Sequence, residues 1–286
     1  AYYRDEFESD AYTLTPKEAC EKVVAGIDEI HLVGGVNPSL SIQYFVDLLL
    51  ALKNRAPKAV IKAFTAVELH ALHKRERIRI ADLLRELKQA GLEMLPGGGA
   101  EIFDSEVRAR TCPVKATGDE WLALHRAAHE LGIRSNSTML HGHIETPENR
   151  IGHLLKLREL QDETGGFIAH VTLPYLHANN ELSSEASPAD SAMDLKQIAI
   201  ARLMLDNFPH VKSYWRAFGI KLAQAGLNSG ADDMDGTISS EDIMHEAGSD
   251  APRGLSPEQM EEIIKETGFV PYRRDAFHNR KPEVSG

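Results

Sequence analysis

The sequence predicts an α/β protein, a β/α barrel that lacks its first strand and the loop after it. Strand and helix patterns alternate along the chain at a spacing of roughly 20 to 45 residues, as in folds with a parallel sheet. Strand patterns occur near residues 30, 60, 94, 135, 167, 211 and 233, whereas a closed barrel needs one more. The chain also opens on a loop that leads into a helix, so we expect the first strand to lie upstream of Ala1. A doubly wound open sheet is the alternative.

Local signals predict each element of the first half. Thr15-Pro16-Lys17-Glu18 combines an N-cap hydroxyl, a proline at the first helical position and a glutamate at the third, so a helix should run to about residue 25. A buried strand over 30–33 then ends in Gly34-Gly35. The elements expected next are a helix over 41–55, a strand over 60–66, a helix over 80–90 with an apolar stripe, and a strand around Leu95.

The second half continues the alternation. Thr117-Gly118-Asp119-Glu120 is a capping box that should start a helix ending at about Leu131. The later elements expected are strands over 135–140, 167–173, 211–215 and 234–238, and helices over 146–163, from Ser187, over 219–227 and from Ser256. We expect residues 1–279 to form one barrel and residues 280–286 to form a flexible tail.

Composition narrows the class of partner. The chain has 286 residues, 42% of them hydrophobic, and a net charge of -11. A nucleic-acid or anionic-membrane surface would need a basic face, so a small-molecule partner is expected, with no nucleic acid and no membrane. No apolar run reaches the roughly 18 residues of a membrane span, and no signal peptide pattern is present. Two cysteines, Cys20 and Cys112, are too few for a disulfide scaffold, which favours the cytoplasm.

Polar and glycine residues gather where the predicted strands end, which is where chemistry collects in such folds. Gly34-Gly35 and Gly97-Gly98-Gly99 are either tight turns or places where backbone approaches a ligand. Glu101, directly after the second of these, could accept hydrogen bonds from a ribose or an ammonium group. Glu68 and Glu145 follow strand ends as well, either as helix-start or surface carboxylates or as parts of the site.

Two histidines raise the possibility of a metal. On an extended segment, His141 and His143 would point the same way, as in zinc-dependent hydrolases built on barrels. No further ligands complete a set, so we assign no metal-binding residue. Asp232, Asp233 and Asp235 at the last predicted strand form either a solvated turn or a hydroxyl-binding site.

Several of these segments together resemble one family. They are Leu32–Gly35, Ile61–Glu68, Leu95–Phe103, Thr138–Leu140 with Gly142–Glu145, Leu160–Phe167 and Gly230–Thr237. In these stretches the sequence is similar to the menaquinone-pathway branch of the radical S-adenosylmethionine enzymes, and most closely to its aminofutalosine-forming members. The resemblance extends over nearly the whole chain.

The resemblance implies a fold and a reaction. The fold is a TIM-like barrel with a 4Fe-4S cluster held by a CxxxCxxC loop after the first strand, and with S-adenosylmethionine bound to the cluster. A 5'-deoxyadenosyl radical would add to 3-[(1-carboxyvinyl)oxy]benzoate, and rearrangement and decarboxylation would give aminofutalosine. Such an enzyme is a transferase and takes electrons from a reductant such as flavodoxin or ferredoxin.

Site residues follow from the resemblance by position. Gly34 and Gly35 match the segment that meets the methionyl amino group, Glu101 an acid near the ribose, and Glu145 the end of a motif near the adenine. These four are the expected cofactor-binding residues. We place Glu68 and His143 in the substrate pocket as candidate catalytic residues because both lie at strand ends.

The sequence also departs from the family. It contains no CxxxCxxC, and Tyr2-Tyr3-Arg4 resembles what directly follows the third cluster cysteine. We therefore expect a truncated chain that binds no cluster and is inactive. Asn37 stands where histidine is usual, and His141 where tyrosine is usual. The rival readings are a cyclic dehypoxanthine futalosine synthase, a deazaflavin-cofactor synthase, a zinc-dependent barrel hydrolase and a non-catalytic scaffold.

Overall fold

A parallel sheet of six strands forms the centre of the protein. The computed structural model describes residue 4 and residues 7–177, 190–238, 244, 248–249 and 251–282. Every strand pairs in parallel with its neighbours in sequence, so the order across the sheet is the order along the chain. The strands are β1 (Glu29–Leu32), β2 (Val60–Ala63), β3 (Met94–Leu95), β4 (Arg134–His141), β5 (Phe167–Pro174) and β6 (His210–Lys212).

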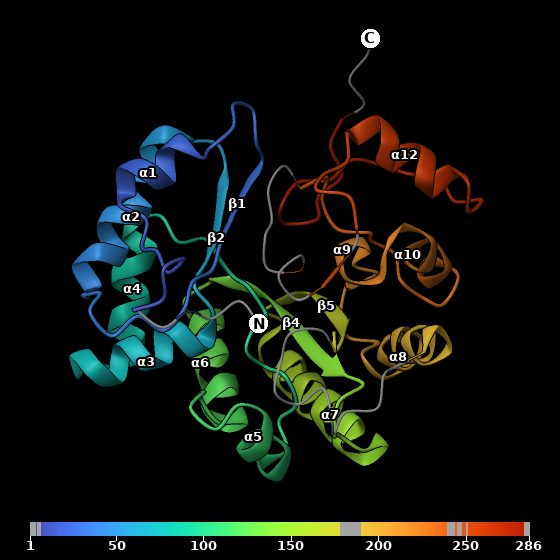
Figure 1. The fold of residues 1–286 in the computed structure, drawn as a ribbon, viewed down its shortest axis with the longest axis horizontal. Coiled ribbons are helices and arrows are strands. Elements are labelled where there is room, and N and C mark those ends of the chain that lie inside the picture. The colour runs from blue at the N-terminus through green and yellow to red at the C-terminus, as the bar shows by residue number, and fades with distance from the viewer. Residues whose placement is uncertain are drawn as a thin grey trace.

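The sequential strand order distinguishes the two folds that the sequence allowed. A doubly wound sheet reverses its order at a switch point, whereas barrel strands follow one another around a ring. The predicted barrel wall is therefore confirmed, and the open-sheet alternative is wrong. Figure 1 shows the helices arranged around the outside of the strands. They are α1 (Pro16–Glu21), α2 (Ile42–Arg55), α3 (Ala66–Glu76), α4 (Ile80–Ala90), α5 (Ser105–Thr111), α6 (Gly118–Glu130), α7 (Pro147–Thr164), α8 (Ser191–Met204), α9 (Trp215–Phe218), α10 (Ile220–Leu227) and α12 (Pro257–Lys265).

The predicted strand at 234–238 is wrong. Only an isolated parallel bridge forms there, between Lys212 and Asp233, supported by a 2.8 Å hydrogen bond from the Ser213 amide to the Asp233 carbonyl. The backbone then turns, because Asp235 and Ile238 have φ angles of 73° and 51°. Such left-handed conformations cannot continue a strand. The seventh strand position is thus occupied by one bridging residue.

Helix α3 was missed although its start signal is in the sequence. Thr65 caps it and Glu68 completes a capping box, so the strand predicted over 60–66 ends at Ala63. Helix α5, capped by Asp104, was missed too. The helix expected from Ser187 is described from Ser191, with Asp190 as its cap, and residues 178–189 lie outside the described part of the chain.

The two faces of the sheet differ in character. On β2, Ile61 and Ala63 are fully buried in the apolar core beneath the outer helices. Lys62 lies between them on the opposite face, where its Nζ is 2.5 Å from Oε1 of Glu29 on β1. Because side chains alternate along a strand, the inner face of the wall is polar where the outer face is apolar.

The C-terminal segment packs against the amino ends of the strands. Arg274 and His278 contact Asp233, and Lys281 forms an ion pair with Asp28 just before β1. A small apolar cluster anchors the segment and consists of Met94, Ile168 and Ala276, with Val60 and Phe277 against them. Arg280, in the predicted tail, bridges to Arg274, and residues 283–286 lie outside the described part.

Candidate functional site

The turns that follow the first four strands are joined to one another at the carboxyl edge of the sheet. The Gly34 amide, after β1, donates a 3.0 Å hydrogen bond to Oε1 of Glu68, after β2. The Leu140 amide, near the end of β4, donates a 3.0 Å bond to the carbonyl of Glu101, after β3. Candidate residues spread over more than a hundred positions therefore share one edge of the wall.

Glu68 is buried and connects two turns. Its Oε2 accepts hydrogen bonds from the amide and the hydroxyl of Thr65, each 2.8 Å long, while its Oε1 accepts the Gly34 amide. The side chain belongs to a residue that is 6% exposed. Burial raises the pKa of Glu68 to about 7, and the hydrogen bonds from Thr65 and Gly34 oppose that rise only in part. The hydrogen bonds that the Glu68 carboxylate accepts therefore come from Thr65 and from the turn after β1.

Glu145 holds the turn after β4 in a similar way. Its Oε1 accepts the Gly142 amide and its Oε2 the His143 amide, both at 2.8 Å. Nη1 of Arg150, on α7, lies 2.6 Å from Oε1. Burial opposes ionisation, but these backbone donors, His143 and Arg150 keep the pKa of Glu145 below its usual value. The Glu145 carboxylate is therefore charged at neutral pH, and both of its oxygens accept hydrogen bonds.

His143 is buried beside this carboxylate. Its Nε2 lies 3.2 Å from the Leu140 carbonyl, and its Nδ1 is 3.3 Å from Oε2 of Glu145. Its ring also meets Tyr175 edge-on, with centroids 5.9 Å apart. Burial lowers the pKa of His143 more than Glu145 raises it, so the ring is neutral at pH 7. A neutral imidazole can accept or donate a proton at one nitrogen.

Glu101 keeps part of its side chain open at the site edge. Its Oε1 is 2.7 Å from Nζ of Lys115, which comes from the loop after α5. Burial works against ionisation, but Lys115, Arg108 and His143 together lower the pKa of Glu101. The side chain is 21% exposed, and its residue has a φ of 46°. Lys115 has no motif around it in the sequence, so this partner could not be predicted.

Packing requires glycine at two of the three positions of the triple glycine, Gly97 and Gly99. A Cβ at Gly97 would lie 2.6 Å from the backbone carbon of Ser137 on β4, and one at Gly99 would lie 2.4 Å from Val67 Cγ2. Gly99 also has a φ of +81°. Arg108 binds the same loop through the Ala100 carbonyl at 2.6 Å. Close approach of strands and helix explains these glycines without a ligand.

Gly34 and Gly35 lie in a different environment. Both are exposed, and a Cβ built at Gly35 would meet no atom within 4 Å. Neither has a positive φ. Nothing in the described protein therefore requires glycine at position 35, and the space in front of it is open. The ligand-approach interpretation suits this turn better than the triple glycine.

His141 and His143 do not point the same way. Gly142 between them has a φ of 85°, so the segment is a turn and the alternation expected of an extended chain does not hold. His141 is fully buried, with its Nε2 2.8 Å from Oδ1 of Asp194 on α8. Among the residues that the structure describes, no group of three or more His, Cys, Asp or Glu side chains could hold a metal ion.

A polar cluster on the inner face was not predicted. Lys62 and Lys212 are almost fully buried, and Lys212 Nζ is 2.5 Å from Oδ1 of Asp235. His31 on β1 pairs with Lys62 and lies on the same inner face, where desolvation inside the wall, followed by the charge of Lys62, lowers its pKa to about 4. Lysine inside an apolar strand pattern, as in Val60-Ile61-Lys62-Ala63, is the signal that could have revealed this cluster.

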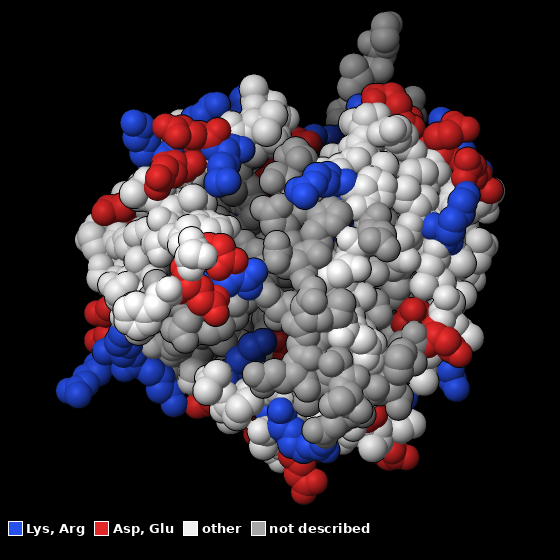
Figure 2. All heavy atoms as spheres, in the orientation of Figure 1, with Lys and Arg blue, Asp and Glu red and all other residues white. Residues whose placement is uncertain are grey.

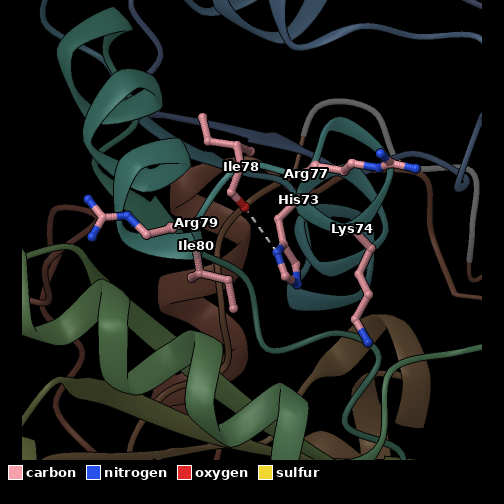
Figure 3. Close-up of a pocket in the computed structure, with 6 residues that line it drawn as sticks. All are labelled: His73, Lys74, Arg77, Ile78, Arg79 and Ile80. Atoms are coloured by element: carbon pink, nitrogen blue, oxygen red, sulfur yellow. Dashed lines mark hydrogen bonds between the residues drawn. The ribbon is translucent and has the colours of Figure 1, made fainter.

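Two surface clefts lie outside the barrel wall. One, of about 450 Å³, is formed by the turn between α3 and α4. Figure 3 shows that Arg77 and Arg79 extend to opposite sides and that Lys74 points a third way, so these cations do not converge on a ligand. The other, of about 760 Å³, lies among α5, α6 and α7 and reaches Lys115. On the face drawn in Figure 2, acidic and basic side chains are interspersed.

No helix in the part of the chain that the structure describes has the length and apolar character that crossing a bilayer demands.

Comparison with known proteins gives two matching families and several relatives. Residues 1–157 match the Radical SAM superfamily, and residues 164–285 match the CofH/MqnC C-terminal region. The chain is 44% identical to the aminodeoxyfutalosine synthase of Thermus thermophilus over 90% of this chain and 70% of that protein. It is 40% identical to the aminodeoxyfutalosine synthase of Streptomyces coelicolor over 100% of this chain and 78% of that protein.

A relative with a different name is similar to the same degree. The 5-amino-6-(D-ribitylamino)uracil–L-tyrosine 4-hydroxyphenyl transferase of Methanopyrus kandleri is 40% identical, over 97% of this chain and 78% of that protein. Two solved structures share the fold at low identity. Methylornithine synthase has a TM-score of 0.66 at 18% identity, over 90% of this chain and 73% of its own. The hydrogenase maturase HydG has a TM-score of 0.70 at 16% identity, over 94% of this chain and 60% of its own.

The superfamily match covers 157 of the 286 residues, and relatives of 40–44% identity extend over most of the chain. With the sequential parallel barrel wall and the joined turns at its carboxyl edge, these findings identify the chain as an enzyme of the radical SAM superfamily.

Proposed function

We propose that the protein carries out the aminofutalosine-forming reaction of menaquinone biosynthesis. In that reaction the 5'-deoxyadenosyl group of S-adenosylmethionine is joined to the enol-ether double bond of 3-[(1-carboxyvinyl)oxy]benzoate, followed by rearrangement and decarboxylation. The observation that carries the proposal is the 44% identity to the Thermus thermophilus synthase along 90% of this chain.

The family uses S-adenosylmethionine and a 4Fe-4S cluster, and the residues present fit the two groups differently. A cluster needs three cysteine ligands besides the cofactor, whereas this chain has two cysteines. Cys20 lies in α1 and Cys112 is buried after α5. These residues do not fit a cluster. The open space in front of Gly35 fits the amino-acid end of S-adenosylmethionine, because an amino group can reach exposed backbone there.

The other site residues divide into two groups in this proposal. Gly34 and Gly35 would meet the methionyl group, and Glu101, with its partly open side chain, would accept a ribose hydroxyl. Glu145 acts by holding the turn after β4, since protein donors occupy its oxygens. That turn presents His143, whose neutral ring is suited to a proton transfer near the substrate.

The proposal includes partners and location. Radical SAM enzymes act on small molecules and need a reductant, and flavodoxin or ferredoxin is the donor we propose. We propose a cytoplasmic location, in keeping with the two free cysteines.

A second candidate is the transfer of the tyrosine side chain to 5-amino-6-(D-ribitylamino)uracil. The 40% identity to the Methanopyrus kandleri transferase over 97% of this chain favours it. The two candidates differ in substrate charge, since one takes a dicarboxylate and the other an amino acid and an uncharged heterocycle.

Substrate binding separates the candidates without need of the cluster. The chain is titrated calorimetrically with 3-[(1-carboxyvinyl)oxy]benzoate, with tyrosine and with 5-amino-6-(D-ribitylamino)uracil. We expect binding of the enol ether alone, and binding of the other two compounds but not of the enol ether would favour the second candidate.

Product formation needs the cluster residues. A chimera carries the part of the Thermus thermophilus relative that precedes the matched region, fused ahead of Ala1. With iron, sulfide, S-adenosylmethionine, reductant and enol ether, it should release aminofutalosine, detected by mass spectrometry. A chimera that holds the cluster and cleaves S-adenosylmethionine but forms no aminofutalosine would contradict the proposal.

A further inference from the structure

Among the helices that the structure describes, three begin with the same capping box, a threonine followed three residues later by a glutamate. In each box the glutamate Oε2 accepts the threonine amide, at 2.8 Å for Glu18, 2.8 Å for Glu68 and 2.9 Å for Glu120. The threonine hydroxyl in turn accepts the glutamate amide at 3.2–3.3 Å. Helix capping is thus satisfied by one carboxylate oxygen in all three cases.

The second oxygen distinguishes Glu68. In the Glu18 box the carboxylate is exposed on the surface, and in the Glu120 box Oε1 meets Lys74 and His70. In the Glu68 box Oε1 instead accepts the amide of Gly34, a residue 34 positions earlier and on a different strand end. A buried carboxylate is unfavourable unless it is hydrogen-bonded, so its position here is set by that contact.

The contact fixes the glycine end of the turn after β1. Gly34 and Gly35 are exposed, and open space lies in front of Gly35. The bond from Gly34 to Glu68 ties the glycine end of the turn to the start of α3, and the bond from the Asn37 amide to the Gly35 carbonyl is internal to the turn. The far end is held separately, because Arg75 donates to the Asn37 carbonyl and Asn37 Nδ2 donates to Thr13. Two adjacent glycines lose much conformational entropy on ordering, so this anchor matters more than it would elsewhere.

We propose that Glu68 is a positioning residue, which holds the Gly34-Gly35 turn in the conformation that receives the amino-acid end of S-adenosylmethionine. It does this through the second oxygen of a helix-capping carboxylate and has no contact with substrate. The inference rests on the proposed function only in taking S-adenosylmethionine as the ligand of the turn.

Amide hydrogen exchange resolved at single residues tests the anchor. Glu68→Ala should speed exchange at Gly34 by about tenfold or more, because the amide loses its acceptor. Glu18→Ala removes the same capping contact from α1 and should leave exchange at Gly34 unchanged. Unchanged exchange at Gly34 in Glu68→Ala would overturn the proposal.

Glu68→Gln is a conservative variant that keeps the test valid if Glu68→Ala fails to fold. A glutamine at position 68 has one acceptor oxygen, so Glu68→Gln cannot accept from both Gly34 and Thr65. Protection should fall at one of those two amides, and full protection at both would overturn the anchor. Mere stabilisation of the fold would predict a uniform change across α3 instead.

Ligand affinity tests the positioning role. Calorimetry with S-adenosylmethionine should show binding to the wild-type chain, about tenfold weaker binding to Glu68→Ala, and wild-type binding to Glu18→Ala. No binding by the wild-type chain, or equal binding by Glu68→Ala, would overturn the role toward the cofactor. Neither readout uses the enol ether or tyrosine, so the inference can fail or hold separately from the substrate assignment.

Discussion

Glu68 and Glu145 perform the same task at two neighbouring turns but with different electrostatic support. The side chain of each is buried, and each accepts backbone amides from the turn after a parallel strand. Glu145 also has Arg150 at 2.6 Å, and its pKa is lowered. Glu68 receives a hydroxyl in place of a cation, and burial raises its pKa to about 7.

The two sets of donors differ in how far they offset burial. The Gly142 and His143 amides, the His143 ring and then Arg150 hold the pKa of Glu145 down, whereas the Thr65 and Gly34 donors only partly oppose the rise at Glu68. The β4 turn should therefore keep its carboxylate charged throughout the neutral range, while the turn after β1 is held by a group that titrates near pH 7. The charge that holds the turn after β4 is therefore constant near neutral pH, whereas the charge of Glu68, which holds the turn after β1, changes with pH.

The largest effect is expected at the paired carboxylate. Glu145→Ala leaves the guanidinium of Arg150 buried without a counter-charge and removes the acceptor of two amides. We expect the free energy of unfolding to fall by about 3–5 kcal/mol, measured by urea denaturation. The control is Glu148→Ala. Glu148 is the second residue of α7, the helix that carries Arg150, and it is exposed, so its replacement should change stability little. A smaller loss for Glu145→Ala than for Glu68→Ala would break the comparison.

The next effect is a pH dependence that belongs to Glu68. The pKa of this acid is raised on folding, so its contribution to stability is present below pH 4.5 and is lost as pH rises through about 7. The loss is at most about 3 kcal/mol, from 1.36 kcal/mol per pKa unit. The unfolding free energy of wild type relative to that of Glu68→Gln should fall as pH rises from 4.5 to 8, because only the wild type loses a bound proton over that interval. Parallel curves would show that Glu68 does not titrate there; Tyr44, whose pKa is raised by burial and by Glu68, is unaffected below pH 8.

Packing, without a carboxylate, holds the turn after β3, and this gives a third case. Gly97→Ala would place a Cβ 2.6 Å from the Ser137 backbone and should lower the free energy of unfolding by about 1–3 kcal/mol. Thermal or urea unfolding measures it. An unchanged free energy of unfolding in Gly97→Ala would mean that β3 and β4 can separate locally. Packing against Ser137 would then not be what fixes the turn after β3.

The smallest effect on stability is expected at Gly35. Its Cβ position is open and its φ is not positive, so Gly35→Ala should change the free energy of unfolding by less than about 0.5 kcal/mol. The same change should weaken binding of S-adenosylmethionine, measured by calorimetry, because a methyl group would occupy the approach to the backbone. Unchanged binding would show that the cofactor does not come close to this residue.

Sequence reasoning predicted what depends on neighbours along the chain. Caps such as Thr117 with Glu120, and the apolar stripe of α4, are local patterns, and the structure contains both. The bond between Glu68 and Gly34 joins the start of α3 to the turn after β1, and the pairing of Glu101 with Lys115 depends on the path of a loop. Such contacts arise from tertiary packing, which no local pattern records.

The predicted histidine pair and the last strand failed for a related reason. Both predictions assumed extended backbone, and both segments contain residues with positive φ, at Gly142 and Asp235. Gly142 carries a visible warning, since glycine often adopts such angles, but an aspartate at φ 73° is not indicated by its residue type strongly enough to predict it.

The segment around Arg274 and Lys281 acts as a clasp between the two margins of the wall. It reaches Asp233 beside β6 and Asp28 before β1, so ion pairs with this segment, together with its apolar cluster, link the last strand position to the first. Attraction of this kind weakens as ionic strength rises, most of all at the exposed Lys281 pair. Concentrated salt should therefore weaken the Lys281–Asp28 pair first, while the buried Arg274–Asp233 pair and the apolar cluster around Ala276 keep the segment in place.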